Sequence, residues 1–229
     1  MYKKFVNARS PLRLLEKGLH GGLGTSNLGV VIAGHGVGKA SFLVGVALDE
    51  LLRSGRVLHV SMAHSVSHIR DHYDTVFEEL ASTTHLEDEA RIHADIDRCR
   101  SIRVYRPNSL TSAKLREAVK IELEAIGQPS LIIIEGLDFD AAVREDILDI
   151  KELAGELAAE VWFSVSSNDE RIESIPTGIA RVEDLVSVVL ALEPGDDAVL
   201  LRALKDHDNA DLSELHVALD PRTLLLTRH

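Results

Sequence analysis

The feature that most constrains the fold is a short apolar run followed at once by a glycine-rich turn and then by a helical pattern. Residues Leu28 to Ala33 (LGVVIA) are apolar on both faces and rich in β-branched side chains, which is typical of a central strand in a parallel sheet. From Lys39 to Arg53 the apolar residues recur with helical spacing, and Ser54-Gly55 closes the segment. This order of strand, loop and helix predicts the first unit of an α/β domain.

The alternation of strand and helix then repeats along the chain. Further strands are predicted at 57–62, 102–105, 131–134 and 161–165, and helices at about 66–80, 112–126 and 144–159. Later strands are predicted at 185–192, 198–204 and 215–226, separated by polar turns that include Asp220-Pro221. We therefore expect an α/β fold with a central, mostly parallel sheet flanked by helices and a C-terminal antiparallel extension.

The length of 229 residues fits a single domain. Within residues 1–229 we expect a leader segment at 1–27 that wraps the edge of the domain, an α/β core at 28–168 and a β-rich extension at 169–229. Hydrophobic residues make up 45% of the chain and charged residues 27%, which is typical of a globular protein and excludes a disordered one.

The sequence also bears on the compartment of the protein. No apolar run approaches the roughly 20 residues that span a bilayer, and the first residues lack the apolar segment of a signal peptide. The single cysteine, Cys99, cannot form an internal disulfide, which fits a reducing compartment. A cytoplasmic protein without a membrane partner is expected.

The net charge of −12 repels polyanions, so nucleic-acid binding would need a local basic patch. The best candidates for such a patch are Arg98, Arg100, Arg103 and Arg106. They follow the strongly acidic stretch 87–97, which favours a mixed, solvated and mobile surface segment over a binding face or a carboxylate catalyst. Nucleic acid is therefore not an expected partner.

The turn after the first strand is a degenerate phosphate loop. Residues 33–40 read AGHGVGKA against the pattern GxxxxGK[ST], with alanine at the first glycine position and again at the Ser/Thr position. Glycines at 34, 36 and 38 allow consecutive backbone N–H groups to point inward, and the following helix adds the positive end of its dipole. The predicted nucleotide-binding residues are Gly34, His35, Gly36, Val37, Gly38, Lys39, Ala40 and Ser41.

Side chains at the end of this loop predict how an anion would be held. Lys39 would contact the β- and γ-phosphates, whereas Ala40 lacks the hydroxyl that normally helps to hold Mg²⁺. Ser41 could replace that hydroxyl in part, although one residue along a helix turns the side chain by about 100°. The alternative interpretation is a glycine-rich turn between strand and helix that binds nothing.

These motifs, in this order, resemble the RecA/KaiC group of P-loop ATPases over nearly the whole chain. The resemblance rests on LLEKGLHGGLGTSNLGVVIAG, GHGVGKAS, VLHVSMAH, LIIIEG, ALKDHDN and LHVALDP. It implies a RecA-like P-loop NTPase fold, ATP or another nucleotide as ligand with Mg²⁺ as an accompanying ion, and assembly as a homo-oligomer or with a protein partner.

The resemblance also implies roles for single residues. The carboxylate that activates water in the family matches Ala63 and is missing, whereas Glu135 matches the Walker B acid and is both a catalytic candidate and, with Ser41, a candidate Mg²⁺ ligand. The strand at 161–165 would lie between the two motif strands. Its end would place Ser166, Ser167 or Asn168 near the γ-phosphate. Lys205 and His207 match a place where oligomeric relatives present basic side chains to a neighbouring subunit.

Three histidines form a second pattern outside the loop. His64, His68 and His72 are four residues apart, a spacing that puts them on one helical face and is compatible with metal ligation beside Asp71 and Asp74. A solvated helix surface is the favoured interpretation of these residues.

Taken together, the residues predict a nucleotide-binding protein of RecA/KaiC type whose hydrolysis is weak or absent and whose role is regulatory. One alternative is an active ATPase in which Ser41, Glu135 and a further carboxylate compensate for the alanines. The other is a scaffold that kept the fold and binds a protein instead of a nucleotide.

Overall fold

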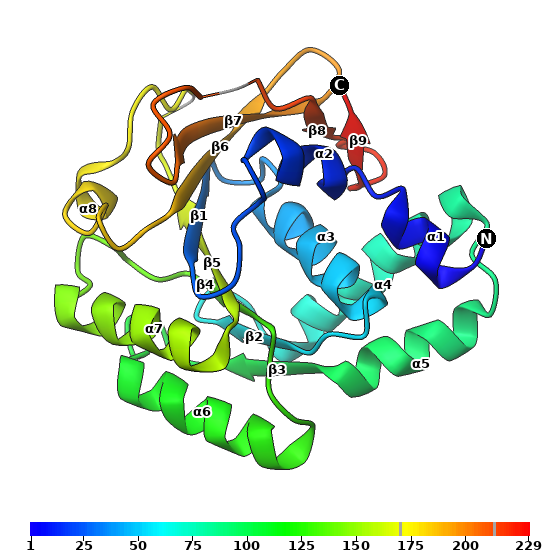
Figure 1. Cartoon of the computed structure of the whole chain (residues 1–229), viewed down its shortest axis with the longest axis horizontal. Coiled ribbons are helices and arrows are strands. Elements are labelled where there is room, and N and C mark those ends of the chain that lie inside the picture. Colours follow the sequence, from blue (N-terminus) through cyan, green and yellow to red (C-terminus); the bar gives the residue numbers. More distant parts are fainter. Residues whose placement is uncertain (170, 213) are drawn as a thin grey trace.

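A single mixed sheet organises the molecule (Figure 1). In the computed structural model, which describes residues 1–169, 171–212 and 214–229, the strand order is β3-β2-β4-β5-β1-β6-β7-β8-β9. The strands are β1 Leu28–Ala33, β2 Val57–Ser61, β3 Arg100–Val104, β4 Leu131–Glu135, β5 Glu160–Ser166, β6 Val188–Pro194, β7 Val199–Asp206, β8 Val217–Leu219 and β9 Leu226–Arg228.

The pairing of these strands confirms the predicted α/β architecture. Strands β3, β2, β4, β5, β1 and β6 run parallel to their neighbours, and β7, β8 and β9 continue the sheet in antiparallel fashion. The predicted segment 215–226 contains two short strands, because Asp220 accepts the N–H of Arg222 and donates its own N–H to Leu225, which turns the chain between β8 and β9. Strand β5 lies between β1 and β4, as expected from the sequence.

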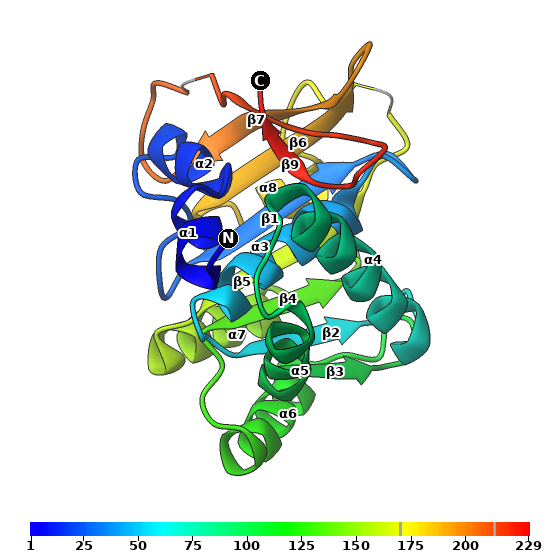
Figure 2. The same ribbon diagram turned by 90° about the vertical axis from the view of Figure 1, so that its right-hand side faces the viewer.

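Helices cover both faces of the sheet (Figures 1 and 2). They are α1 Lys3–Ala8, α2 Leu12–Gly18, α3 Lys39–Leu52, α4 Val66–Thr84, α5 Glu89–Cys99, α6 Ser112–Ala125, α7 Arg144–Leu157 and α8 Thr177–Ala180. One apolar core joins α1 to α5 to the sheet, and a second joins α6, α7 and α8 to its other face. Among the described residues, no helix is long and apolar enough to cross a membrane.

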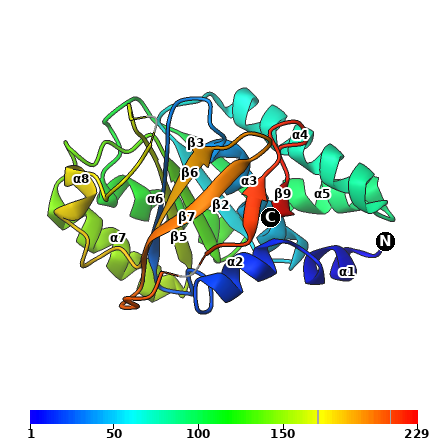
Figure 3. The same cartoon turned by 90° about the horizontal axis from the view of Figure 1, so that it is seen from above.

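The predicted leader segment forms two short helices. These helices, α1 and α2, belong to the apolar core on the same face of the sheet as α3 (Figure 3). Val6, Leu12 and Leu15 are buried there, and the side chain of Asn7 donates to the backbone carbonyl of Asp49 in α3 at 3.0 Å. Burial of these apolar side chains explains why the leader packs on the face.

The acidic stretch differs from its prediction, because it contains α5 instead of a mobile segment. Ile92 and Ile96 are buried one helical turn apart, which anchors the helix against the core despite its charge. Asp95 and Asp97 pair with arginines three residues later. Arg103, in turn, pairs with buried Glu122 at 2.7 Å, so three of the four arginines considered as a basic patch are paired with carboxylates.

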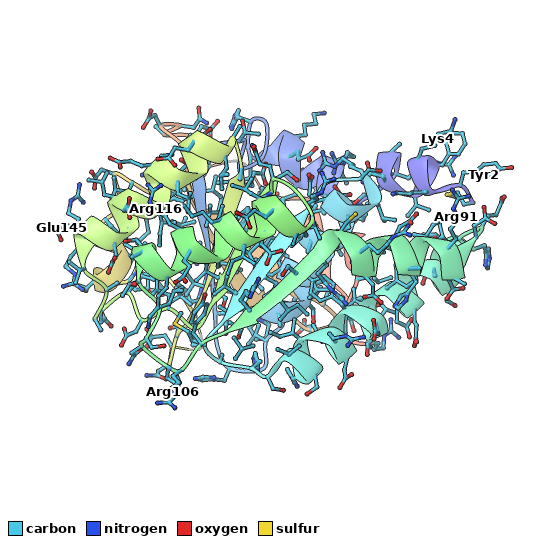
Figure 4. The ribbon with its side chains drawn as sticks, turned by 90° about the horizontal axis from the view of Figure 1, so that it is seen from below. Tyr2, Lys4, Arg91, Arg106, Arg116 and Glu145 are labelled. Carbon is cyan, nitrogen blue, oxygen red and sulfur yellow. The ribbon has the colours of Figure 1, made fainter. Side chains whose placement is uncertain are left out.

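Charged side chains on the outer helices lie at the periphery of the molecule (Figure 4). Arg91, Arg106 and Glu145 project from three separate regions of that view. Arg116 joins the two outer helices, with its guanidinium 2.7 Å from a carboxylate oxygen of Asp149 in α7. Such exposed pairs contribute only about 0 to 1 kcal/mol each, so the two apolar cores dominate the stability.

Two glycine substitutions test this packing. A Cβ atom added at Gly29 in β1 would lie 2.7 Å from the ring of Trp162 in β5, and that ring is itself held edge-on to Phe42. We expect Gly29→Ala to lower the free energy of unfolding by about 1 to 3 kcal/mol. As the matched control, Gly155→Ala lies in exposed helix with no atom within 4 Å and should raise it by about 0.5 to 1 kcal/mol. Urea unfolding followed by circular dichroism measures both, and a neutral Gly29→Ala would contradict the described packing.

Candidate functional site

A cleft of about 1550 Å³ opens at the carboxyl ends of β1, β2, β4 and β5. The strands are parallel, so the loops that follow them meet at one edge of the sheet, which is where ligands bind in open α/β sheets. The described residues that line this strand-end cleft come from four segments: 35–41, 63–72, 135–140 and 164–179.

The loop between β1 and α3 forms one wall of the strand-end cleft. Gly36 and Gly38 have φ angles of 75° and 121°, a left-handed backbone that other residues adopt only with strain. The helix begins at Lys39 without a side-chain cap, and in the part of the chain that the structure describes the N–H groups of 35–38 donate to no backbone carbonyl. These donors and the helix dipole make the loop suited to an anion.

The C-terminal extension packs against this loop through Leu219. A Cβ atom at Gly38 would lie 2.4 Å from a methyl carbon of Leu219 in β8, so both the φ angle and the contact require glycine. Val37 packs against the same apolar core, and its side chain therefore points away from the cleft that His35 and Gly36 line. Gly34 is half-buried beside Val37.

Lys39 closes the loop on itself. Its ammonium donates to the carbonyls of Ala33 at 2.9 Å and Gly34 at 2.8 Å. Burial lowers the pKa of Lys39 below its ordinary value, and the carboxylate of Glu135 opposes this shift. A phosphate in the cleft would supply an anionic partner that two neutral carbonyls cannot supply.

The two residues after Lys39 differ in what they present. Ala40 lines the cleft with a methyl group. Ser41 also lines it, but its side chain is buried, and its hydroxyl oxygen lies 3.2 Å from Nε2 of His72 in α4. The hydroxyl that could replace the one missing at Ala40 is thus already bonded to an imidazole.

Glu135, at the end of β4, belongs to a buried polar chain below the cleft. Its Oε2 lies 3.2 Å from Nε2 of His59 in the neighbouring strand β2, at an ion-pair distance but off the line of a hydrogen bond. Nδ1 of His59 lies 3.1 Å from the hydroxyl of Tyr73, and the guanidinium of Arg100 lies 4.4 Å from the Tyr73 ring centroid.

The polar side chains around Glu135 set its ionisation. Burial raises the pKa of Glu135, but the nearby imidazoles of His59 and His64 and the hydroxyl of Ser61 outweigh it and hold the pKa below its ordinary value. Burial also raises the pKa of Tyr73 strongly, so its phenol stays neutral. Glu135 is therefore a carboxylate at neutral pH, directed toward His59 and also lining the cleft.

The turn after β2 places Ala63 on the cleft wall. The hydroxyl of Ser61 accepts the N–H groups of Ala63 at 3.1 Å and His64 at 3.0 Å, which fixes the turn. The Cβ atom of Ala63 faces Gly136, where a further Cβ would lie only 3.2 Å away. A methyl group therefore stands at the position where the resemblance called for a carboxylate.

The end of β5 meets the end of β1 in the middle of the cleft. The backbone N–H of Ser167 donates to the carbonyl of Ala33 at 2.9 Å, and Ser166, Ser167 and Asn168 all line the cleft. These polar residues therefore lie beside the glycine-rich loop, and their contact with a γ-phosphate stays a prediction.

Lys205 and His207 lie apart from the residues that line the cleft. The Lys205 ammonium donates to the carbonyl of Glu183. His207 contacts Asp206 at 2.8 Å and the carbonyl of Leu23 at 3.1 Å, and His20 of the leader contacts the same buried carboxylate. Both basic side chains are thus engaged within their own chain, where His207 joins the extension to the leader.

The three spaced histidines line the cleft, with His64 and His68 exposed, as expected of a solvated surface, and His72 half-buried. The rings of His64 and His68 are stacked with centroids 4.5 Å apart, and His72 contacts Ser41. Asp74 turns away to His93 at 3.0 Å. Among the described residues, no group of three His, Cys, Asp or Glu side chains is arranged to hold a metal ion.

Several site residues escaped the sequence analysis. His59 and Tyr73 meet Glu135 only because β2 pairs with β4 and α4 packs above them; a histidine inside the apolar strand 57–62 was the available signal. The cleft is also lined by acidic residues and one cation that follow β4 and β5: Asp138, Asp140, Asp169, Glu173 and Arg171. These residues lie in loops without a recognisable motif.

Comparison with known proteins adds no family to this description. No protein-family model matches the sequence, and no curated protein matches it. The fold and the cleft define an α/β protein with a mostly parallel sheet, antiparallel C-terminal strands and a glycine-rich loop at the carboxyl edge of the sheet.

The ionised state of Glu135 gives a pH test. Because the native pKa is lowered, the carboxylate stabilises the fold in full above its ordinary pKa of 4.5, and this contribution is lost as the pH falls through the native value. We expect Glu135→Gln to lower the free energy of unfolding at pH 7 by on the order of 1 to 3 kcal/mol. The difference from the unmodified protein should shrink below pH 4.5.

Urea unfolding at pH 7, 5 and 4 measures this difference. Glu124→Gln, at an exposed position on α6, is the control and should change little at any of the three values. A difference for Glu135→Gln that grows as the pH falls would contradict the account of Glu135.

Proposed function

We propose that this protein binds ATP or a related nucleotide in the strand-end cleft as a RecA/KaiC-like P-loop protein, with weak or absent hydrolysis and a regulatory role. The observation that carries the proposal is the loop at 34–41. Its two left-handed glycines, its uncapped helix start and Lys39 stand together on the wall of a large cleft. Backbone donors of this kind bind phosphate in proteins of different families.

The strand order supports the same proposal. The strand that carries the phosphate loop is separated from the strand that ends in Glu135 by β5, which is the order that the resemblance implies. Polar residues at the end of β5 stand between the two motif strands, beside the loop. This agreement concerns topology and is independent of the degenerate loop sequence.

Slow hydrolysis follows from the side chains of the cleft. Ala63 offers no carboxylate to activate water, and Ala40 offers no hydroxyl to a metal ion. The carboxylate of Glu135, at the end of β4, is buried and lies 3.2 Å from Nε2 of His59. Loss of a general base alone costs about 10² to 10⁴ in rate, whereas phosphate binding by backbone amides is unaffected.

A regulatory nucleotide-binding protein needs a partner, either further copies of the same chain or another protein. The sheet ends in β3 on one side and β9 on the other, and edge strands offer unpaired backbone groups for such contacts. A cytoplasmic location remains part of this proposal.

A second function, that of a protein-binding scaffold without nucleotide, is favoured by one observation. The ammonium of Lys39 is already bonded to the carbonyls of Ala33 and Gly34, so the lysine could serve to close a structural turn. In that case Lys39 contributes to stability in the absence of any ligand.

Nucleotide binding by a Lys39→Met variant separates these functions. We expect Mg-ATP to bind the unmodified protein and, at 100 times its Kd, to raise the free energy of unfolding by about 2.7 kcal/mol. Loss of the charged contact should weaken binding roughly tenfold to a hundredfold. Lys120→Met, at an exposed position on α6, should leave it unchanged.

Titration calorimetry and thermal unfolding, each with and without nucleotide, provide the measurements. A scaffold would show no heat and no thermal shift at millimolar nucleotide, together with a loss of ligand-free stability in Lys39→Met that Lys120→Met does not show.

The rate of ATP turnover tests the alternative that the protein is an active ATPase. We expect ATP hydrolysis below about 0.1 s⁻¹, at least a hundredfold under the typical enzyme rate of about 10 s⁻¹. The assay is phosphate release under saturating Mg-ATP, with Lys39→Met as background. A rate near 10 s⁻¹ that disappears in Lys39→Met would establish an active ATPase and overturn this part of the proposal.

A further inference from the structure

The oxygen ligands that Mg²⁺ prefers are poorly represented at the phosphate loop. Mg²⁺ requires near-octahedral oxygen ligands, but Ala40 has no side-chain oxygen, and the hydroxyl of Ser41 is buried against His72. The carboxylate of Glu135 is likewise buried, 3.2 Å from Nε2 of His59. The residues present therefore do not fit the metal ion that usually accompanies a nucleoside triphosphate.

Histidine side chains line the cleft beside the phosphate loop. His64 and His68 are exposed, line the same cleft as Lys39 and stack with ring centroids 4.5 Å apart. Stacking of this kind puts two imidazole edges side by side at the start of α4. His72, one turn farther along, contacts Ser41 on α3 and so ties the histidine-bearing helix to the helix of the phosphate loop.

The loops after β4 and β5 line the opposite side of the cleft with mostly acidic side chains. Asp138, Asp140, Asp169 and Glu173 outnumber the cation Arg171 there. Their loops are anchored through Phe139 and Ile172 in the apolar core beneath α7 and α8, on the far face of the sheet from α4. A polyphosphate is repelled by these carboxylates. It is therefore directed to the side formed by the phosphate loop and α4.

We propose that His64 and His68 hold the terminal phosphate of the bound nucleotide through imidazole N–H groups, so that the site retains a nucleoside triphosphate without a divalent cation. The inference rests on the proposed nucleotide site and names the ligand state that this site selects. His72 acts as a positioning residue, because it contacts the Ser41 hydroxyl beside the loop.

The chemistry of the groups agrees with this role. Each imidazole carries an N–H donor in its neutral form and two in its protonated form, and hydrogen bonds to a charged phosphate are stronger than those to neutral acceptors. A diphosphate lacks the phosphate group that would reach the histidines. The pair therefore distinguishes triphosphate from diphosphate, whereas the loop amides and Lys39 bind both.

The test is calorimetric titration of ATP and ADP into the full-length chain, once with Mg²⁺ and once with EDTA. For the unmodified protein we expect the ATP Kd in EDTA to lie within about threefold of the Kd in Mg²⁺. In the double variant His64→Gln/His68→Gln, ATP affinity in EDTA should fall about tenfold or more. ADP affinity should change by less than about threefold, which also reports that the loop is intact.

The matched control is His85→Asn. His85 follows α4 at its far end, in a left-handed conformation that asparagine accepts, and it lies 17 residues beyond His68, on the order of 25 Å along the helix axis. Its ATP and ADP affinities should equal those of the unmodified protein.

Two results would overturn the inference while leaving nucleotide binding in place. One is ATP binding that disappears in EDTA, and the other is a double variant that binds ATP as well as the unmodified protein does. If neither ATP nor ADP binds the unmodified protein in any buffer, the proposed nucleotide site itself fails, and the inference fails with it.

Discussion

The backbone between β1 and α3 is the constraint on which the rest of the site depends. Left-handed glycines at 36 and 38 allow the chain to turn from a buried strand into a helix, and among the described residues the N–H groups of 35–38 have no backbone partners. A methyl carbon of Leu219 in β8 packs against Gly38, where an added Cβ atom would displace it. The antiparallel extension thus does more than lengthen the sheet, because it holds the loop in the shape that an anion would require.

The surroundings of this loop bring polar and apolar side chains together. Lys39, Glu135 and the polar end of β5 meet at one edge of the sheet, and Ala40 and Ala63 add methyl groups to the cleft wall. Imidazoles lie beside them: His59 beneath the cleft and His64, His68 and His72 along its wall. These residues are the basis on which we propose a site that holds a phosphate chain without cleaving it efficiently.

Much of this architecture could be predicted from the sequence, because buried strands and amphipathic helices leave periodic patterns. The predicted bounds of the strand at 28–33 and of the helix that begins at Lys39 agree with the structure to within one residue. Helix α5 could not be predicted, because acidic residues surround the two isoleucines, one turn apart, that anchor it. The glycine-rich loop could be located from the sequence, because its residues follow a known pattern. The contact of His59 with Glu135 could not be predicted, since it depends on which strands pair.

The most direct test of the central claim is a heteronuclear NMR titration of the protein with ATP. If the loop amides bind phosphate, the N–H resonances of Gly36, Gly38 and Lys39 should shift together and saturate with the Kd measured by calorimetry. Those of Ser112 and Lys114, whose N–H groups are already bonded to Asp146 and Thr111, should stay in place. Unchanged loop resonances at saturating ATP, or saturable shifts confined to another part of the chain, would contradict the account.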